Sequence, residues 1–305
     1  MDHPDPSPSI TLVGTPYWLG VAEALFRRAG IRVAQVSDTP RWLGLSWVLS
    51  RAFRRARVIH MVWGGHVVAS IAARLLGKTL VWHWIGTDVL GLRQRKGWVA
   101  RLRRWIARRC VRAHLADSPE LARELEVSGI HAEVCRLLPA SIESEAMPLP
   151  EAFRVLSYWN DERMAFYGGR TILEVARRMP DVEFLIVGAT GAGVTAPGNV
   201  RFLGQVSNLD PIYEKTSVFL RLPEHDSLSA MVLEALARGR FVVCNRDFPH
   251  CLRAETVDQV WTALRRLADA KAPNHDGAVF VQERFSLDRE ADGLRRLYAR
   301  LGLDR

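Results

Sequence analysis

The stretch HDSLSAMVLEALARGRFVV, from His225 to Val243, combines the signals of a loop, a helix and a strand. Serines precede an apolar run that carries one acid, Glu234, and Gly239 follows the run, as is common after a helix end. The next residues, 240–245, predict a buried strand. An acid in an apolar helix face is costly unless a polar partner meets it. Either water or a ligand must therefore receive Glu234.

The same alternation of strand and helix runs along the chain. The predicted strands are 10–14, 31–37, 56–65, 79–86, 113–118, 132–139, 154–159, 181–188, 199–206, 217–223 and 240–245. The predicted helices between and after them include 17–30, 66–78, 98–112, 119–129, 168–179, 208–216, 256–269 and 285–302. Such alternation indicates parallel sheets covered on both faces.

The segment 140–153 lacks periodicity and contains two prolines, which is typical of a linker. The pattern restarts after it. The sequence therefore predicts an α/β protein with two Rossmann-like domains facing a central cleft. The expected boundaries are 1–147 for the first domain, 148–284 for the second and 285–305 for a C-terminal helix that packs back toward the first.

Composition is consistent with two domains and indicates the cellular compartment. The chain has 305 residues, of which 48% are hydrophobic, enough for two cores. Its four cysteines form no C-x-x-C pair, which favours reduced, mostly buried thiols. The N-terminus lacks the features of a signal peptide, and segment 67–86 is too polar to cross a bilayer. We expect a cytoplasmic protein without a membrane span.

The loop before the helix of the opening stretch is a candidate anion site. In open α/β sheets, ligands bind at the carboxyl ends of strands, where helices begin. The backbone amides of Leu228, Ser229 and Ala230, with the helix dipole behind them, suit a phosphate. Glu234 follows about one and a half turns later, where a carboxylate can bind vicinal hydroxyls such as those of a ribose. The alternative is a surface helix in which Asp226 is the cap and Glu234 is solvated.

The stretch from Asp226 through SLSAMVL to Glu234 resembles the E-x7-E donor signature of retaining GT-B glycosyltransferases of the family-4 type. LEALARGRFVV, PDVEFLIVG, NVRFLGQV, DSPELARELEVSGI and the terminal ERFSLDREADGLRRLYARL resemble the same family. The resemblance implies a GT-B fold and transfer of a sugar, with retention and without a metal or cofactor, from a nucleotide-sugar donor to an acceptor hydroxyl. It places the donor sugar on Asp226, the ribose on Glu234 and the diphosphate on the amides between them.

The residues expected to bind the donor come from both halves of the chain. They are Gly14, Arg163, Gly204, Asp226, Ser227, Leu228, Ser229, Ala230 and Glu234. The first acid is one methylene shorter than the usual Glu. The family's R-x4-K-G motif is incomplete, because Gly168 falls near the expected lysine; either Arg163 or Arg170 would then supply positive charge to the diphosphate.

Two polar residues at the end of the strand 79–86 are expected to meet the acceptor. His83 and Asp88 lie at the end of this strand, facing the presumed cleft, where the resemblance implies a His or an Asp that meets the acceptor or the donor sugar. With Asp226 they are predicted to be the catalytic residues; the alternative is that they are satisfied structural groups. His66 is a further candidate on the neighbouring strand. VGATGAG, 187–193, follows a strand but leads into a proline rather than a helix, so it is interpreted as a flexible loop and not as a dinucleotide site.

A strongly basic helix dominates the charge of the first half. Nine Lys or Arg residues and no acid lie between Arg93 and Arg112, in a chain of net charge +9. One interpretation is an ordinary amphipathic helix with a solvated basic face. The other is docking onto an anionic membrane surface through Trp98, Arg101, Arg104 and Arg108. No nucleic-acid motif accompanies the charge, so nucleic acid is not an expected partner.

We therefore expect a transferase in polysaccharide or cell-envelope synthesis, with a saccharide or a lipid-linked acceptor. The basic face is the argument for the lipid-linked acceptor and for a location at the inner face of a membrane. Two alternatives remain open: a GT-B nucleotide-sugar epimerase, and a non-catalytic sugar-nucleotide-binding protein, which the missing lysine favours.

Overall fold

The computed structural model describes residues 10–37, 51–63, 67–94 and 97–302. The chain divides into two compact units. Unit 1 comprises residues 1–140 and 286–305, and unit 2 comprises residues 141–285. His66 lies outside the described residues.

Unit 1 contains a parallel sheet of six strands in the order β2-β1-β3-β4-β5-β6. The strands are β1 (Ile10–Gly14), β2 (Val33–Ser37), β3 (Val58–Val62), β4 (Thr79–Trp84), β5 (Ala113–Ala116) and β6 (Glu133–Val134). The helices are α1 (Pro16–Arg28), α3 (Arg51–Arg55), α4 (Val67–Leu75), α5 (Thr87–Gln94), α6 (Trp98–Arg109), α7 (Pro119–Val127) and α13 (Leu287–Arg300). The predicted strands are confirmed, each within its expected range.

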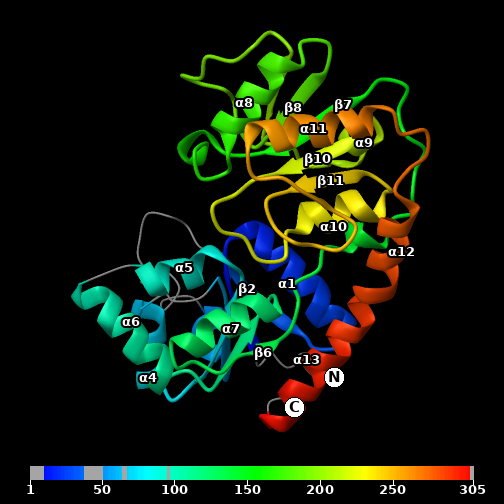
Figure 1. The fold of residues 1–305 in the computed structure, drawn as a ribbon. Coiled ribbons are helices and arrows are strands. Elements are labelled where there is room, and N and C mark those ends of the chain that lie inside the picture. The colour runs from blue at the N-terminus through cyan, green and yellow to red at the C-terminus, as the bar shows by residue number, and fades with distance from the viewer. Residues whose placement is uncertain (1–9, 38–50, 64–66, 95–96, 303–305) are drawn as a thin grey trace. The chain divides into compact units, whose positions relative to one another are not determined.

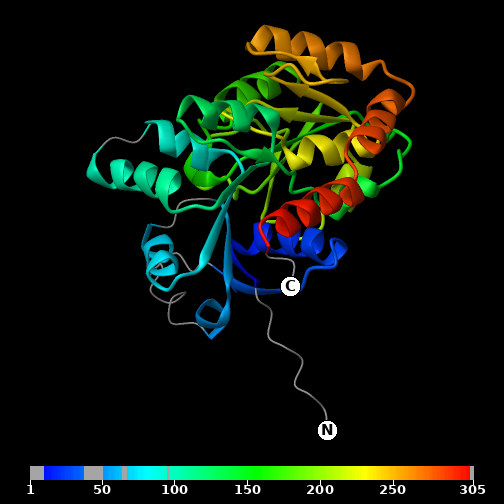
Figure 2. The same cartoon turned by 90° about the horizontal axis from the view of Figure 1, so that it is seen from below.

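Helices cover both faces of this sheet, as its all-parallel pairing requires. On one face α1 and α13 pack together over a core that includes Phe26 and Leu294, and Figure 2 shows these two helices side by side. On the other face the core draws residues from α4, α5, α6 and α7. The C-terminal helix is therefore part of unit 1, where Arg28 Nε donates to Asp288 at 2.6 Å.

Unit 2 contains a second parallel sheet of six strands, in the order β12-β11-β10-β7-β8-β9. The strands are β7 (Arg154–Tyr158), β8 (Glu183–Val187), β9 (Val200–Gly204), β10 (Val218–Arg221), β11 (Phe241–Cys244) and β12 (Leu252–Arg253). The helices are α8 (Gly169–Arg178), α9 (Asp210–Glu214), α10 (Ala230–Ala237), α11 (Val257–Ala268) and α12 (His275–Arg284), with short 3-10 helices η1 (Ala140–Glu143) and η2 (Asp161–Arg163). As Figure 1 shows, α8 and α11 lie together on one side of the sheet, and α10 packs with α12 on the other.

Local sequence explains where several helices begin. Ser118 accepts a hydrogen bond from the amide of Leu121, and Pro119 occupies the first helical position of α7, as predicted. At α11, Thr256 and Gln259 form a reciprocal capping box. The elements that the sequence pattern missed are α3, α5, α12 and β12. Of these, α12 begins with a side-chain cap from Asn274 but carries Gly277 in its first turn, so its apolar spacing is weak.

Candidate functional site

The candidate site lies at the carboxyl edge of the unit 2 sheet, where β10 leads through residues 222–229 into α10. α10 begins at Ala230, with Ser229 in the N-cap position and no side-chain cap hydrogen bond. The first N–H groups of α10 are thus not satisfied by a capping side chain, and an anion can accept from them. The expected helix start is confirmed, and the cap is Ser229 rather than Asp226.

Glu234 is buried on α10, and its polar partners come from its own unit. The Tyr213 hydroxyl donates to one carboxylate oxygen at 3.1 Å, and the Ser141 hydroxyl donates to the other. Burial raises the pKa of Glu234, while these two hydroxyls and the nearby Arg238 oppose the rise. The acid of the opening stretch is therefore neither solvated nor unpartnered.

Arg238 extends this network around the base of α10. Its Nη1 donates to the carbonyl oxygens of Ser141, at 2.9 Å, and Glu234, at 3.1 Å. Its Nη2 pairs with Asp210 of α9, and its guanidinium lies 5.0 Å from the centre of the Tyr213 ring. Three segments distant in sequence are thereby fixed around the Glu234 carboxylate.

Asp226 lies in the loop before α10 and is held from two directions. Arg221, the last residue of β10, donates through Nε to one Asp226 oxygen at 2.8 Å. The amide of Ser227 donates to the other oxygen at 3.2 Å. Only 12% of the Arg221 side chain and 16% of the Asp226 side chain are exposed. This is a partly buried ion pair with little freedom to reorient.

Aromatic rings surround the Arg221 side of this pair. The guanidinium of Arg221 lies 5.0 Å from the Tyr167 ring centre and 5.7 Å from that of Tyr158. The two tyrosines pack edge to face, with ring centres 5.1 Å apart. Arg163 lies 4.0 Å over the ring of Phe166. Cation–aromatic contacts of this kind fix a guanidinium plane without neutralising its charge.

The backbone at Gly168 leaves no room for the lysine that the family's R-x4-K-G motif would place near this residue. Gly168 caps α8 in a left-handed conformation, with φ of 74°. A Cβ atom there would lie 2.7 Å from both the Cβ and the carbonyl oxygen of Leu222, so no side chain fits without a shift of the backbone. Of the two arginines that sequence offered instead, Arg163 stacks on Phe166, and Arg170 is an exposed residue of α8.

Two further glycines mark the same edge of the sheet. Gly204 ends β9 with φ of 64°, and open space surrounds the position that a Cβ would take. Its carbonyl accepts from the amide of Gly188 at 2.7 Å. After Gly188, the Asp161 carboxylate binds the amides of Thr190 and Gly191, both at 3.1 Å. No helix occurs in 188–199, which confirms VGATGAG as a loop.

Three residues of unit 1 that were predicted to bind a substrate or to take part in catalysis, Gly14, His83 and Asp88, are buried. Asp88 accepts from the amides of Gly86, at 2.9 Å, and Val89, at 3.0 Å, at the start of α5. Gly14 ends β1, where a Cβ would lie 2.9 Å from the carbonyl oxygen of Val62, so it permits close approach of two strands. His83 is fully buried on β4. Their predicted roles in binding and catalysis stay predictions.

His83 belongs to a chain of buried, hydrogen-bonded polar groups. The carbonyl that accepts from His83 fixes which ring nitrogen carries the proton, and this sets the donor and acceptor at each following group. His83 Nε2 must donate to the carbonyl of Cys135, at 2.7 Å, so in the neutral ring Nδ1 is an acceptor. His60 Nε2, at 3.3 Å, then donates to it, and the Tyr298 hydroxyl donates to His60 Nδ1 at 2.7 Å. Burial lowers the pKa of His83 to about 4, against the effect of the Cys135 carbonyl. This chain ties α13 to the centre of the unit 1 sheet.

Helix α6 exposes a face that mixes tryptophan and arginine. Trp98 and Trp105 are 69% and 56% exposed. Spacings of three and four residues place Arg101, Arg108 and Arg109 on the same side, and all three are exposed. Arg104 turns toward the protein, where its Nη1 donates to the Leu92 carbonyl at 3.1 Å. The basic surface therefore includes exposed aromatic rings, but Arg104 is not fully part of it.

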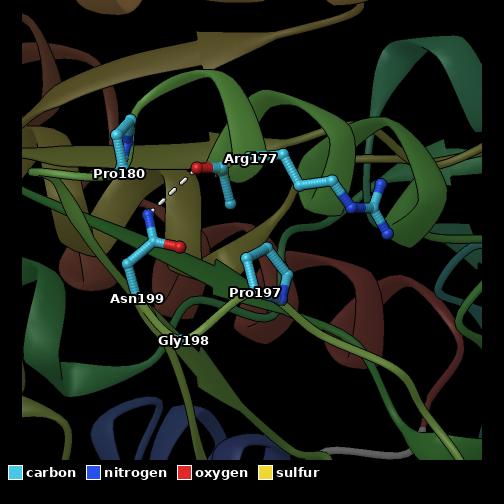
Figure 3. A pocket seen from close by; sticks show the side chains of 6 residues that line it. Arg177, Pro180, Pro197, Gly198 and Asn199 are labelled. Carbon is cyan, nitrogen blue, oxygen red and sulfur yellow. Dashed lines mark hydrogen bonds between the residues drawn. The ribbon is translucent and has the colours of Figure 1, made fainter.

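A hollow of about 550 Å³ in unit 2 lies at the opposite edge of the sheet. It is lined by Ala176, Arg177, Pro180, Pro197, Gly198 and Asn199, which precede β8 or β9. In Figure 3 the Asn199 amide points to the end of α8, and Arg177 extends away from it. The amide donates to the carbonyls of Ala176, Met179 and Val182 at 2.7–3.0 Å. Asn199 therefore serves the fold.

The described residues contain no group of three or more His, Cys, Asp or Glu side chains that could hold a metal ion. Within the same ranges, no helix has the length and apolar character needed to span a bilayer.

Residues of the candidate site that sequence reasoning missed include Ser141, Tyr213 and Arg221. Ser141 fell in the predicted linker, and Tyr213 fell on a short helix, so neither carried a signal of its own. Arg221 did carry one, because it is a lone cation at the end of an apolar strand, and strand ends in parallel sheets face the ligand edge.

Comparisons with known proteins identify the architecture. No protein-family model and no curated protein sequence matches the chain. Among solved structures, it is similar to Anabaena Alr3699/HepE in complex with UDP-glucose, with a TM-score of 0.77 and 12% identity over 95% of this chain and 99% of that one. It is also similar to sucrose-phosphate synthase from Thermosynechococcus elongatus, with a TM-score of 0.74 and 15% identity over 98% of this chain and 100% of that one. For the lipopolysaccharide outer core galactosyltransferase WaaB the TM-score is 0.61, with 14% identity over 95% of this chain and 99% of that one.

These neighbours are GT-B glycosyltransferase structures, so the predicted GT-B fold, with its two parallel Rossmann-like sheets, is confirmed. At identities of this size the likeness establishes the fold alone.

Proposed function

We propose that the protein is a retaining, metal-independent glycosyltransferase that moves a sugar from a nucleotide-sugar donor to an acceptor hydroxyl. The observation that carries the proposal is a pair of acids, the partly buried Asp226 and the buried Glu234, on either side of an uncapped helix N-terminus at the carboxyl edge of the unit 2 sheet. Acids suit hydroxyls, and free amides suit a diphosphate. A UDP-glucose complex with the same fold adds support.

In this proposal each group has a separate task. Glu234 accepts from the ribose hydroxyls, the amides of residues 228–230 hold the diphosphate, and Asp226 accepts from hydroxyls of the transferred sugar. Charge develops on the departing diphosphate as the glycosidic bond breaks, so fixed donors and cations near it lower the barrier. Unit 1 supplies the acceptor site, near the edge that His83 and Asp88 occupy.

We further propose that the protein works in the cytoplasm at the inner face of a membrane, on a lipid-linked acceptor for polysaccharide or cell-envelope synthesis. The exposed face of α6 supports this, because each cation near an anionic surface contributes about 1 kcal/mol and exposed tryptophans suit the interface.

A screen of nucleotides and nucleotide sugars by thermal shift tests the donor site. A ligand at about 100 times its Kd should stabilise the protein by about 2.7 kcal/mol. Incubating the donor that binds with and without saccharide or lipid-linked acceptors, and analysing the products, then separates the alternatives. Sugar transfer supports the proposal. A changed sugar configuration on the intact nucleotide indicates an epimerase, and binding without any turnover indicates a non-catalytic protein.

Liposome sedimentation tests the membrane face separately. Binding should require anionic lipid and fade in high salt, because the Debye length falls from about 10 Å at 0.1 M to about 3 Å at 1 M. Replacing Arg101, Arg104 and Arg108 with glutamate should abolish it and leave nucleotide binding intact. Equal pelleting with neutral and anionic vesicles, or none with either, would identify the basic face as a solvated surface.

A further inference from the structure

The Arg221–Asp226 ion pair at the end of β10 leaves hydrogen-bond donors of the arginine unused. Arginine has five N–H donors in a planar fork. In Arg221 only the Nε donor is used, by Asp226. Among the residues that the structure describes, the hydrogen bond to Asp226 is the one that the Arg221 side chain forms, and its two terminal amino groups form none. The side chain is nevertheless mostly enclosed, and tyrosine rings stand beside its guanidinium.

The position of Arg221 connects it to the proposed phosphate site. Its partner Asp226 also accepts from the amide of Ser227, which is two residues before the N-cap of α10. The Asp226 carboxylate therefore links the Arg221 guanidinium to the backbone segment that leads into the uncapped N-terminus of α10. Burial acts to lower the pKa of Arg221, but the charge and hydrogen bond of Asp226 more than offset it, so the pKa is raised and the side chain stays cationic.

Position 168 has no room for a basic side chain, so a cation for the phosphate site must come from another element, and Arg221 at the end of β10 is placed to supply it. The residue that Gly168 touches, Leu222, directly follows Arg221 in the chain. A long basic side chain at position 168 would collide with Leu222, whereas Arg221 reaches the same neighbourhood from the strand end, with its guanidinium beside Tyr167. Arg163 instead lies over the ring of Phe166, and Arg170 is an exposed residue of α8.

We infer that Arg221 supplies the positive charge for the diphosphate of the bound nucleotide: Nε holds Asp226, and the two amino groups donate to phosphate oxygens. This rests on the proposed function, since it assigns a residue to the donor site that function requires. A guanidinium fits phosphate oxygens with two parallel hydrogen bonds, and one already fixed by a carboxylate and two rings loses little freedom when it does so.

The experiment compares binding of a nucleoside diphosphate and its monophosphate by calorimetry. The nucleotide is the one that binds most tightly among UDP, GDP, ADP, CDP and dTDP. In Arg221→Gln, affinity for the diphosphate should fall at least about tenfold, which corresponds to about 1.4 kcal/mol, while affinity for the monophosphate changes less. Arg221→Lys should restore part of the loss. Arg265→Gln, a matched change in an exposed arginine of α11, should leave both affinities within about twofold.

Two controls keep the result specific. Arg221→Gln leaves Asp226 without its partner, so the double variant Arg221→Gln/Asp226→Asn is measured too. If the double variant regains diphosphate affinity, the loss came from the stray carboxylate and the inference is overturned. It is also overturned if Arg221→Gln binds the diphosphate normally, or if only Arg163→Gln loses it. If the unaltered protein binds none of the five nucleotides, the proposed function itself falls.

Discussion

Replacing Glu234 with glutamine separates a role in binding from a role in folding. The substitution keeps the side-chain shape and removes the charge. If Glu234 accepts hydrogen bonds from ribose hydroxyls, the loss of a charge-assisted bond should cost about 1.5–3 kcal/mol. Affinity for the nucleoside diphosphate should therefore fall by about 10- to 150-fold.

The effect on stability has the opposite sign. Burial raises the pKa of Glu234 in the folded protein above its ordinary value of 4.5. The folded state thus holds the proton to higher pH than the unfolded state, and stability from this group falls as pH rises from the unfolded pKa through the folded one. Glutamine has no such cost. The variant should be as stable as the unaltered protein or more stable at pH 8, and this advantage should shrink below about pH 4.5.

The assay pairs titration calorimetry with urea unfolding at several pH values between 4 and 8. Glu151→Gln, at an exposed glutamate before β7, is the matched control and should change neither quantity. Weaker nucleotide binding together with equal or higher stability at pH 8 identifies a residue kept for its ligand. Unchanged affinity in a folded variant would refute the ribose role. Weaker binding with a large loss of stability would make Glu234 a structural residue of α10.

Three further predictions concern single positions. Asp226→Asn should reduce turnover at least about tenfold with less than about threefold change in nucleoside diphosphate affinity, measured by initial rates and calorimetry; if both fall together, Asp226 builds the loop instead of reading the sugar. Gly168→Ala should lower the free energy of unfolding by about 1–3 kcal/mol, because of the left-handed backbone and the contact with Leu222, while Gly198→Ala, in open space, should not; equal urea curves would contradict this. Because the pKa of His83 is lowered to about 4, stability should fall as pH drops from about 6.5 to 4, and His83→Gln should flatten this slope in unfolding curves; an unchanged slope would disprove it.

The fold was predictable because its signals are local and repeated. The central strands of the two sheets are short apolar runs, and helix starts such as Ser118-Pro119 carry their own caps. Parallel pairing follows from the alternation itself. The missed elements are those with little local signal. The strand β12 has two residues and the helix α3 has five, while α5 and α12 each contain a glycine, which is a poor helix former.

The candidate site was predictable only in part, because its motif is local but its support is not. Asp226, Glu234 and the helix start lie within one short stretch. The hydroxyl of Ser141 that meets Glu234 is 93 residues away, and nothing in its own neighbourhood predicts that contact. His83 shows the converse, since a polar residue at a strand end gives the same sequence signal whether it faces a ligand or, as here, lies fully buried in a hydrogen-bonded chain.

The polar partners of Glu234 decide what a ligand can do there. An ionised carboxylate offers about four lone-pair sites, and Ser141 and Tyr213 each occupy one, on different oxygens. The cost of burying the acid is thus partly offset before any nucleotide binds, and lone pairs remain for ribose hydroxyls without displacing either residue. Both partners are hydroxyls, which hold the carboxylate in place without cancelling its charge. Arg238, the nearby cation, donates to the backbone carbonyl of Glu234 and pairs with Asp210 instead. A site that keeps a buried acid oriented and only half satisfied is suited to a ligand that brings donors of its own.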